Sequence, residues 1–431
     1  MMPDQTTATW ILGLSFVILL ILRFPVALTL VGSSLLTIWY LDIPLVVVGQ
    51  QMIQGISVYS LLAIPFFILT GQILGEGGLA NRIVNLANLF VGRISGGLSL
   101  VNSVACIFFG NLSGSAVADA SAIGSVMIPL MKKKGYAADY SVGVTISSAI
   151  QGVVVPPSHN LVLYSIAAGG ISISGLFLAG IVPGIILLSS LCLTGWIIAV
   201  KNNYPKGDPI VKSQIPSILF HGLLSFTPAV IILGGIISGW ATATESGALA
   251  AVYSFILAFF VYREASLKQM WPLLVRTFRT VLMVFFLIAA SNAFGWVMAY
   301  LHLPDIITDW FLSVSETPWV ILLLINILLL ILGGPMDMAP MILILTPVLL
   351  PVAMKIGMDP IHFGIMLIFN AGMGLLTPPV GTVLFVGCAI GKVSVEAGTR
   401  AMMPFFLAMM VVLMIITYVP AFSMWLPMLF K

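Results

Sequence analysis

The residues best suited to chemistry in this chain are small, uncharged and rich in oxygen, and they lie in two pairs of segments. The first pair is "GNLSGS" at 110–115 and "PPSHN" at 156–160, and the second is "GGPMD" at 333–337 and "TPPVGT" at 377–382. Carbonyl and side-chain oxygens with at most one carboxylate suit Na⁺ better than a divalent ion, which gathers more carboxylates. The pattern therefore predicts two alkali-cation sites.

Each site is expected to combine a polar tip with the broken segment that follows it. Glycine permits unusual backbone angles, and a double proline removes two donors and breaks a helix, which frees carbonyl oxygens for a cation. A new half-helix should begin near 156–158 and near 378, with the positive end of its dipole in the site. The predicted first Na⁺ site comprises Asn111, Ser113, Ser148, Gly152 and Pro156. The predicted second site comprises Gly333, Gly334, Asp337, Asn370, Gly374 and Thr377.

The two pairs of segments belong to an internal repeat. The double prolines at 156 and 378 are 222 positions apart, and the same offset aligns 129–172 with eleven identities in forty-four positions. Several of these identities are Gly and Pro, which apolar composition alone does not explain. The loop at 132–139 carries three lysines and is expected inside the cell, whereas its counterpart at 354–361 is expected outside. Similar segments of opposite orientation form an inverted-topology repeat, typical of secondary transporters.

Composition places these segments in a membrane. The chain is 60% hydrophobic and only 7% charged, and apolar runs such as 176–200, 222–240 and 402–427 are long enough to cross a bilayer. This predicts an all-α polytopic membrane protein. Three single cysteines support neither a disulfide framework nor a thiolate metal site, and a net charge of +3 from short basic loops gives no reason to expect nucleic acid.

The expected spans follow from the positions of Lys and Arg. Residues 5–41 are either two short spans that turn at "RFP" 23–25 or one long kinked span, and two spans are preferred because they keep Arg23 inside the cell. Further spans are expected at 59–75, 140–166, 176–200, 222–240, 242–262 and 281–300. Segments 96–131 and 318–352 are expected to be re-entrant helical hairpins, because each arm has only about 14 to 16 residues and is too short to cross alone. Both hairpins are followed by discontinuous helices.

Some of the polar residues also have plain structural readings. Ser113, Ser115 and Asp337 are good N-cap residues, and each could simply cap the second arm of its hairpin. Asp119 could be a hydrogen-bonded structural acid, although burying a carboxylate in a membrane favours a functional role. His159 reads as a polar wall residue beside Asn160 rather than a proton carrier.

Together, the opening stretch, "PPSHN", "TPPVGT" and "GGPMDM" resemble the large membrane subunit of TRAP transporters, the tripartite ATP-independent periplasmic transporters. The resemblance covers essentially the whole chain. It implies a non-enzymatic permease of the bacterial inner membrane that couples a Na⁺ gradient, with two or more ions and no organic cofactor, to uptake of an organic acid. It also implies a small four-helix membrane subunit and a periplasmic substrate-binding protein as partners. A C4-dicarboxylate, a sialic acid or another sugar acid are the substrates implied, and His159 and Asn160 after "PPS" favour a larger polyhydroxylated acid.

The resemblance also implies an elevator-type division into scaffold and transport domain. Residues 1–93 would hold scaffold spans and a first arm helix at 76–92. Residues 201–317 would hold further scaffold spans and a second arm helix at 303–315. Residues 94–200 and 318–431 would form the two repeats of the transport domain, the first with hairpin 96–131, broken span 140–166 and span 176–200. The second would have hairpin 318–352, broken span 360–385 and span 402–427.

No Lys or Arg falls in a predicted tip or broken segment, so an anionic substrate would depend on helix N-termini, hydroxyls and amides. The candidate substrate residues are Ser115, Asp119, Ser158, His159, Asn160, Thr377 and Thr382. A stand-alone symporter of Na⁺ and a divalent anion, with related architecture, is the main alternative. An intramembrane protease is disfavoured because "NLSGS" has Asn111 where a "GxSG" motif needs Gly, and a channel is disfavoured because facing hairpins would occlude a pore.

Overall fold

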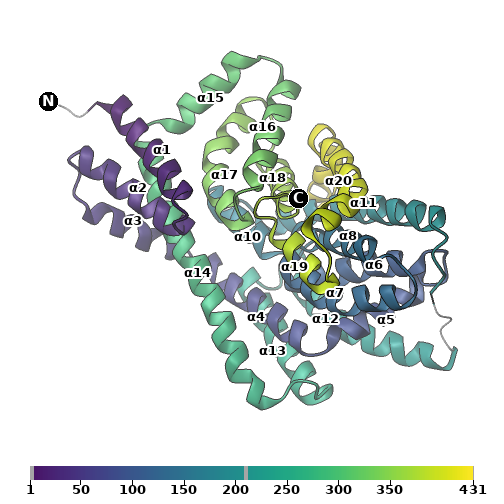
Figure 1. Ribbon diagram of the computed structural model, residues 1–431. Coiled ribbons are helices and arrows are strands. Elements are labelled where there is room, and N and C mark those ends of the chain that lie inside the picture. Colours follow the sequence, from purple (N-terminus) through teal and green to yellow (C-terminus); the bar gives the residue numbers. More distant parts are fainter. Residues whose placement is uncertain (1–3, 208–211, 431) are drawn as a thin grey trace.

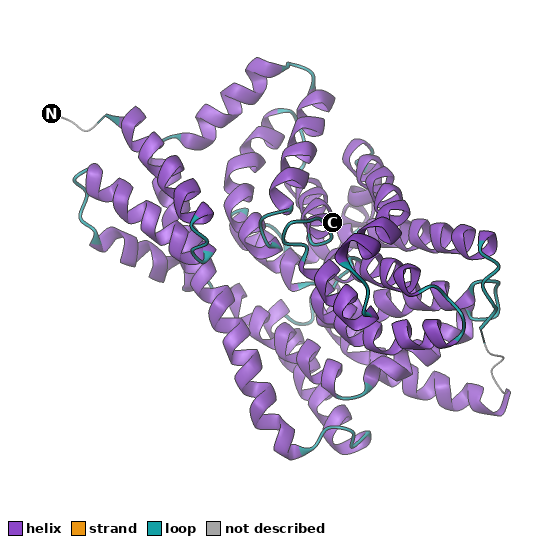
Figure 2. Cartoon of the chain, viewed as in Figure 1, coloured by secondary structure: helices purple, strands orange, loops and turns teal. Residues whose placement is uncertain are grey.

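The computed structural model describes residues 4–207 and 212–430, and in these ranges all regular secondary structure is helical. Figure 2 shows the helices joined by short loops. Within the described ranges, seven helices are long and apolar enough to cross a membrane. The prediction of an all-α polytopic membrane protein is confirmed.

The chain begins with two short antiparallel helices, as predicted for 5–41. Helix α1 (Gln5–Ile21) begins at Asp4, whose carboxylate accepts hydrogen bonds from two backbone N–H groups, and α2 (Val26–Tyr40) follows a turn in which Arg23 has a φ of 63°. The next helices are α3 (Val46–Ile56), α4 (Ala63–Glu76) after a 3₁₀ turn, and the amphipathic α5 (Leu79–Val91). Helix α3 was not predicted from the sequence, because its eleven residues are too few for a span.

The first repeat has the predicted order of hairpin, broken helix and long span. Its helices are α6 (Gly97–Ser113), α7 (Ala116–Lys133), α8 (Ala138–Ala149), α9 (Gln151–Val154), α10 (His159–Ala167) and α11 (Ile173–Lys201). The hairpin turns at Gly114, whose φ of 61° favours glycine. The break between α9 and α10 contains the cis bond between Pro156 and Pro157.

The second repeat has the same order of elements. Its helices are α16 (Pro318–Gly333), α17 (Met338–Lys355), α18 (Pro360–Gly374), α19 (Thr382–Gly391), α20 (Val395–Tyr418) and α21 (Ala421–Leu429). The half-helix expected near 378 starts only at Thr382, because residues 378–380 form a turn and Gly381 adopts a φ of 34°. The span expected at 402–427 is divided: α20 begins earlier, at Val395, and ends at Tyr418 before Pro420.

Three of the four hairpin arms are longer than the 14 to 16 residues expected. The arms have 17 and 18 residues in the first hairpin and 16 and 18 in the second. The difference lies at the helix ends, because α6 continues into the tip as far as Ser113, and α7 and α17 continue to Lys133 and Lys355, beyond the ends expected at 131 and 352. One arm, α17, is among the seven helices long enough for a span.

The segment between the repeats contains α12 (Ile215–Ile237), α13 (Ala243–Ile256) with a π-helical end, α14 (Leu267–Tyr300) and α15 (Leu303–Val314). Helix α14 has 34 residues, and it starts well before the span expected at 281–300. A capping box formed by Ser266 and Gln269 fixes its beginning, so Arg276 and Arg279 lie in the helix rather than in a loop. Figure 1 shows α14 running the length of the molecule beside α2, α3 and α4.

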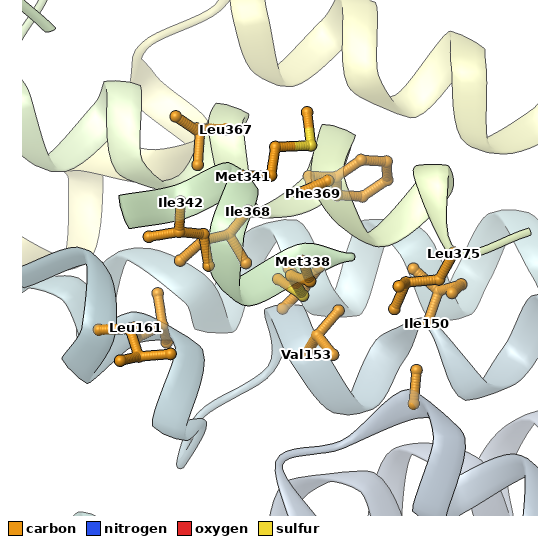
Figure 3. Close-up of a cluster of buried hydrophobic side chains, with 14 of the residues drawn as sticks. Ile150, Val153, Leu161, Met338, Met341, Ile342, Leu367, Ile368, Phe369 and Leu375 are labelled. Carbon is orange, nitrogen blue, oxygen red and sulfur yellow. The ribbon is translucent and has the colours of Figure 1, made fainter. Parts of the chain in front are cut away.

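The two repeats share one core. Figure 3 shows apolar side chains from the broken helix of each repeat and from the second hairpin packed against one another. The labelled residues are Ile150, Val153, Leu161, Met338, Met341, Ile342, Leu367, Ile368, Phe369 and Leu375. The contact is close at Gly372, where an added Cβ would lie 2.9 Å from Cγ2 of Val153. The two broken helices are therefore held together by direct packing.

Candidate functional site

The tip of the first hairpin rests on the broken helix of its own repeat through two glycines. A Cβ added to Gly110 would lie 2.4 Å from Cα of Gly152, and one added to Gly152 would lie 2.8 Å from Cα of Gly110. Real side chains do not fit at these distances. The two backbones therefore touch at the position where the sequence predicts a cation site.

The second repeat makes the same contact. A Cβ added to Gly374 would lie 2.7 Å from Cα of Gly333, and Gly374 is the repeat counterpart of Gly152. The tip also pairs with the turn after the double proline, because the backbone N–H of Val380 donates to the carbonyl of Gly334 at 3.2 Å. The predicted association of Gly333 and Gly334 with Gly374 is thus present. The sequence comparison missed Gly110, because the tips align at an offset of 223 rather than 222.

A polar pair joins the first arm of each hairpin to the broken helix of the same repeat, one turn before the glycine of that broken helix. In the first repeat the hydroxyls of Ser103 and Ser148 are 2.8 Å apart. In the second, Nδ2 of Asn370 donates to Oδ1 of Asn326 at 2.9 Å. Ser148 and Asn370 were predicted as ligands, whereas their partners Ser103 and Asn326 were not. These partners lie in the first arm of each hairpin, where the apolar surroundings concealed them.

Several buried oxygens around these contacts have no hydrogen-bond partner. They are Oδ1 of Asn111, both carboxylate oxygens of Asp119, the hydroxyl of Ser147, Oε1 of Gln151 and Oδ1 of Asn370. A buried polar atom without a partner costs about 1–3 kcal/mol, so such atoms call for an explanation. A Na⁺ ion binds hard oxygen atoms, and the oxygens named above are free to bind one because no hydrogen-bond donor occupies them. These oxygen atoms fit the two predicted cation sites: five lie in the first repeat, and Oδ1 of Asn370 lies in the second.

Three of the predicted ligands, Asp337, Pro156 and Thr377, have structural roles, and a fourth, Ser113, lacks the cap role that the sequence offered as an alternative. Asp337 is exposed and caps α17, accepting from the backbone N–H of Met338 at 2.9 Å. Ser113 is the last residue of α6 and caps no helix, so the capping alternative is wrong for this residue. The Pro156 ring lies against α11, where a Cβ on Gly180 would be 3.2 Å from its Cδ. Thr377 donates its hydroxyl hydrogen to the carbonyl of Gly374 at 2.9 Å.

A cavity of about 560 Å³ lies beside the first tip. It is bounded by the tip, α7 and the start of α10 on one side and by α4 and α14 on the other. Its polar wall includes Gln72, Ser113, Ser115, Ser121, Ser125 and His159. Helix α4 lies directly on the tip, because a Cβ on Gly71 would be 2.9 Å from Cα of Ser113. The cavity is therefore closed on one side by the backbone of the tip.

The structure brings only part of the predicted substrate set to this cavity. Ser115 and His159 line it, and Nδ1 of His159 has no hydrogen-bond partner. Ser158 caps α10, and Asn160 donates to the carbonyl of Gly114 at 3.1 Å, so both hold the tip in place behind the wall. Asp119 is fully buried, and Oδ2 of its carboxylate would lie 3.3 Å from a Cβ added to Gly110.

The remaining two substrate candidates, Thr377 and Thr382, belong to the second tip region and do not line this cavity. Thr382 is the first residue of α19, and its hydroxyl oxygen has no partner. The cavity is thus built on one repeat only. Sequence reasoning grouped the two tips because they are related, not because a contact between them was visible.

The electrostatics of the cavity are those of helix ends. The N-termini of α7 and α10, capped by Ser115 and Ser158, lie at its wall with their positive dipole ends. Among the residues that the structure describes, no Lys or Arg side chain lines this space. The nearby Glu76 lines its edge and is paired with Arg276 at 2.7 Å. An anion here would meet backbone N–H groups and hydroxyls.

Comparisons with known proteins agree with this architecture. Residues 14–422 match the family described as "Tripartite ATP-independent periplasmic transporter, DctM component". The chain is 39% identical to the sialic acid TRAP transporter large permease of Vibrio cholerae over 385 residues, which cover 89% of each chain. It is 35% identical to the C4-dicarboxylate TRAP transporter large permease of Rhodobacter capsulatus, covering 98% of this chain and 99% of the relative.

Solved transporter structures are also similar in fold. The YdaH transporter of Alcanivorax borkumensis aligns with a TM-score of 0.60 at 14% identity, covering 86% of this chain and 87% of that one. The relatives named here are transport proteins, in keeping with the predicted class.

Proposed function

Because the chain belongs to the DctM family of TRAP transporter large permeases, we propose that it is the membrane-embedded permease of a Na⁺-coupled system for the uptake of an organic acid. Members of this family work with a small membrane subunit and a periplasmic binding protein. The observation that carries the Na⁺ coupling is the pair of glycine contacts, Gly110 on Gly152 and Gly333 on Gly374, together with buried oxygens that have no hydrogen-bond partner, several in the first repeat and Oδ1 of Asn370 in the second.

The two hairpins enter the membrane from opposite faces in this proposal. Arms of 16 to 18 residues are about 24–27 Å long, shorter than a hydrocarbon core of about 30 Å. A tip with non-helical backbone is tolerated at that depth because it is covered by protein, and both tips are buried against their broken helices. The repeated element order supports the repeat, and the three lysines at 132–134, which favour the inside of the cell, support its inversion.

Each Na⁺ ion is held between a tip and a broken helix. Asn111 and Gln151 supply side-chain oxygens in the first repeat, and Asn370 does so in the second. The glycine contacts bring the backbone of the tip, with its carbonyl groups, against the backbone of the broken helix, because no side chain separates them. An ion bound there would fix the tip to the broken helix and so complete the cavity wall.

The substrate carboxylate binds at the first cavity through Ser115, His159 and the N-termini of α7 and α10. With no cationic side chain in the lining, the charge of the bound Na⁺ is needed to balance the anion. Substrate affinity should therefore depend on Na⁺. The hydroxyl-rich wall supports a polyhydroxylated acid, and His159 is the part of the predicted specificity motif that lies in the cavity, since Asn160 is bound to Gly114.

Transport requires the cavity to open on the other side of the membrane. We place the moving body at 94–200 and 318–431, whose broken helices share one core, and the scaffold in the remaining helices, joined by the arms α5 and α15. The cavity lies between these two bodies, against α4 and α14. An elevator motion of the first body along the second would carry the ions and the acid together across the inner membrane.

Reconstitution tests the proposal. The substrate is first identified by a thermal-shift screen of the cognate binding protein with sialic acid, C4-dicarboxylates and other sugar acids. Uptake of the labelled acid is then measured in proteoliposomes containing the permease alone, with the small subunit, and with both partners. We expect uptake only with both partners and an inward Na⁺ gradient. Uptake by the permease alone would instead indicate a stand-alone Na⁺ symporter, and uptake without a Na⁺ gradient would refute the coupling.

A further inference from the structure

A second cavity with polar walls lies along α14, apart from the one assigned to the substrate. It has a volume of about 430 Å³ and borders α14 at Ile288, Ser291 and Gly295, whereas the first cavity borders α14 at Thr280 and Val284. From Thr280 to Ser291, α14 rises by about 16 Å. The two spaces are thus separate sites at different heights on one helix.

The second cavity is the repeat counterpart of the first. Ser121 and Ser125 of α7 line the first cavity, and Leu343 and Pro347 of α17, at the repeat offset of 222, line the second. The same side of each hairpin arm therefore faces a space against α14. The chemistry has changed, because the hydroxyls of the first repeat are replaced by apolar groups.

The opposite wall is polar and rigid. It carries Gln51 and Gln54 of α3 and Ser291, Asn292 and Trp296 of α14. Nδ2 of Asn292 donates to the backbone carbonyl of Gln51 at 2.7 Å. A Cβ on Gly55 would lie 2.5 Å from Cβ of Asn292, so α3 is packed tightly on α14. The shape of this wall does not depend on the hairpin that faces it.

One group on this wall lacks a partner. Ser291 is only 7% exposed, and its hydroxyl oxygen makes no hydrogen bond although the residue lines the cavity. A ligand with a hydroxyl or amide group would satisfy it. No Asp, Glu, Lys or Arg lines the space among the described residues, so a charged ligand would lose its hydration without gaining a counter-ion. The indole of Trp296 offers a flat apolar surface and an N–H donor.

We propose that this cavity is a binding site for an uncharged amphiphile with a hydroxyl-bearing headgroup. The headgroup lies against Ser291, Gln54 and Trp296, and the apolar chain lies along Leu343 and Pro347. Such a ligand can come from the water phase as a glycoside or from the bilayer as a glyceride. On the proposed function, it would bridge the scaffold helices α3 and α14 to the moving helix α17 and so oppose transport without competing with the acid.

The binding test uses the permease in lipid nanodiscs and octyl β-D-glucoside below its micelle concentration. Binding is followed by the change in tryptophan fluorescence, with Trp296→Phe as the variant that should lose the saturable signal. Octyl β-D-glucuronide is the matched charged probe and should bind at least tenfold more weakly. Ser291→Ala removes one hydrogen bond and should weaken glucoside binding about two- to tenfold, whereas Ser189→Ala, on an exposed face of α11, should leave it unchanged.

Dioleoylglycerol added to the nanodiscs distinguishes the two sources. Competition with the glucoside would assign the natural ligand to the bilayer, and absence of competition would assign it to the water phase. Equal binding of glucoside and glucuronide, or glucoside binding unaffected by both Ser291→Ala and Leu343→Trp, would overturn the proposal. The binding readout requires no transport, so it stands or fails independently of the proposed function. Inhibition of uptake by the bound glucoside, with an unchanged apparent KM for the acid, tests the bridging role.

Discussion

The glycine contact between tip and broken helix gives the sharpest mutational prediction. Alanine at Gly152 would place its Cβ 2.8 Å from Cα of Gly110, and alanine at Gly374 would place its Cβ 2.7 Å from Cα of Gly333. Ordinary contact begins at 3.4 Å, so each tip must retreat by at least 0.6 or 0.7 Å. Both contacts are backbone against backbone, and no flexible side chain can yield instead.

The cost of such overpacking is about 1–3 kcal/mol for each substitution, a change of about 5- to 150-fold in the folding equilibrium. Alanine is a better helix former than glycine by about 0.8–1 kcal/mol, so the net loss of stability is at most about 2 kcal/mol. The matched control is Gly234→Ala in α12, where an added Cβ meets no heavy atom within 4 Å and the helix should gain stability.

The assay is reversible unfolding of the purified permease in an SDS titration. We expect Gly152→Ala and Gly374→Ala to lower the free energy of unfolding and Gly234→Ala to keep or raise it. The two destabilised variants should also need more Na⁺ for half-maximal uptake, because the retreat of the tip separates the carbonyls. If both variants are as stable as Gly234→Ala and bind Na⁺ normally, the close contact and the argument built on it are wrong.

Three further predictions concern the site and its frame. Asp337→Asn keeps a good N-cap but removes the charge. A tenfold or greater rise in the Na⁺ concentration for half-maximal uptake would identify Asp337 as a ligand, whereas a normal titration would leave it as a cap of α17. Ser113→Ala should weaken the Na⁺ dependence of uptake less, because it removes only a hydroxyl. In a background without Cys106, Cys192 and Cys388, cysteines replacing the exposed Lys133 and Lys355 should react with an impermeant maleimide from opposite faces, and labelling from one face would contradict the inverted repeat. Arg82 pairs with Glu264 at 2.5 Å and lies 3.7 Å from the centre of the Tyr262 ring. Arg82→Gln should therefore loosen the start of the arm α5 and slow uptake without changing the Na⁺ titration. An unchanged rate of uptake would show that these three residues do not anchor the arm.

Much of the architecture could be predicted from local sequence signals. The break at Pro156 and Pro157, the start of α10 and the turn of the first hairpin follow from proline chemistry, from Ser158 as an N-cap and from glycine at a positive φ. The repeat was visible because these residues cannot be exchanged freely and so align at a constant offset. The order of helices in both repeats was predicted for the same reason.

Helix ends and side-chain partners were harder to predict from the sequence. The start of α14 depends on a capping box at Ser266 that precedes the apolar run, so a search for hydrophobic spans missed it. The second arm of the second hairpin, α17, continues past Pro347 and Pro351 to Lys355 because tertiary packing outweighs the local cost of proline. Asn326 could not be identified as the partner of Asn370, because that pairing joins residues 44 positions apart.

The candidate site was predicted in outline but not in detail. Ser115 and His159 line the cavity, whereas Asp119, Ser158 and Asn160 lie behind its wall. Residue type alone does not distinguish these two groups, since all five are polar and close to a tip. The direction of each side chain is set by its place on the helix that carries it or on the turn before that helix, and that requires the folded backbone.

Ion binding itself is measured most directly by titrating the purified permease with NaCl or KCl at constant ionic strength while following its thermal unfolding. A ligand that binds only the folded state at 100 times its Kd stabilises it by about 2.7 kcal/mol. We predict saturable stabilisation by Na⁺ and none by K⁺, with the Na⁺ curve shifted to higher concentration in Asn111→Ala and in Asn370→Ala but not in Gly234→Ala. Superimposable Na⁺ and K⁺ curves, or Na⁺ curves unmoved by both asparagine substitutions, would contradict two cation sites between the hairpin tips and the broken helices.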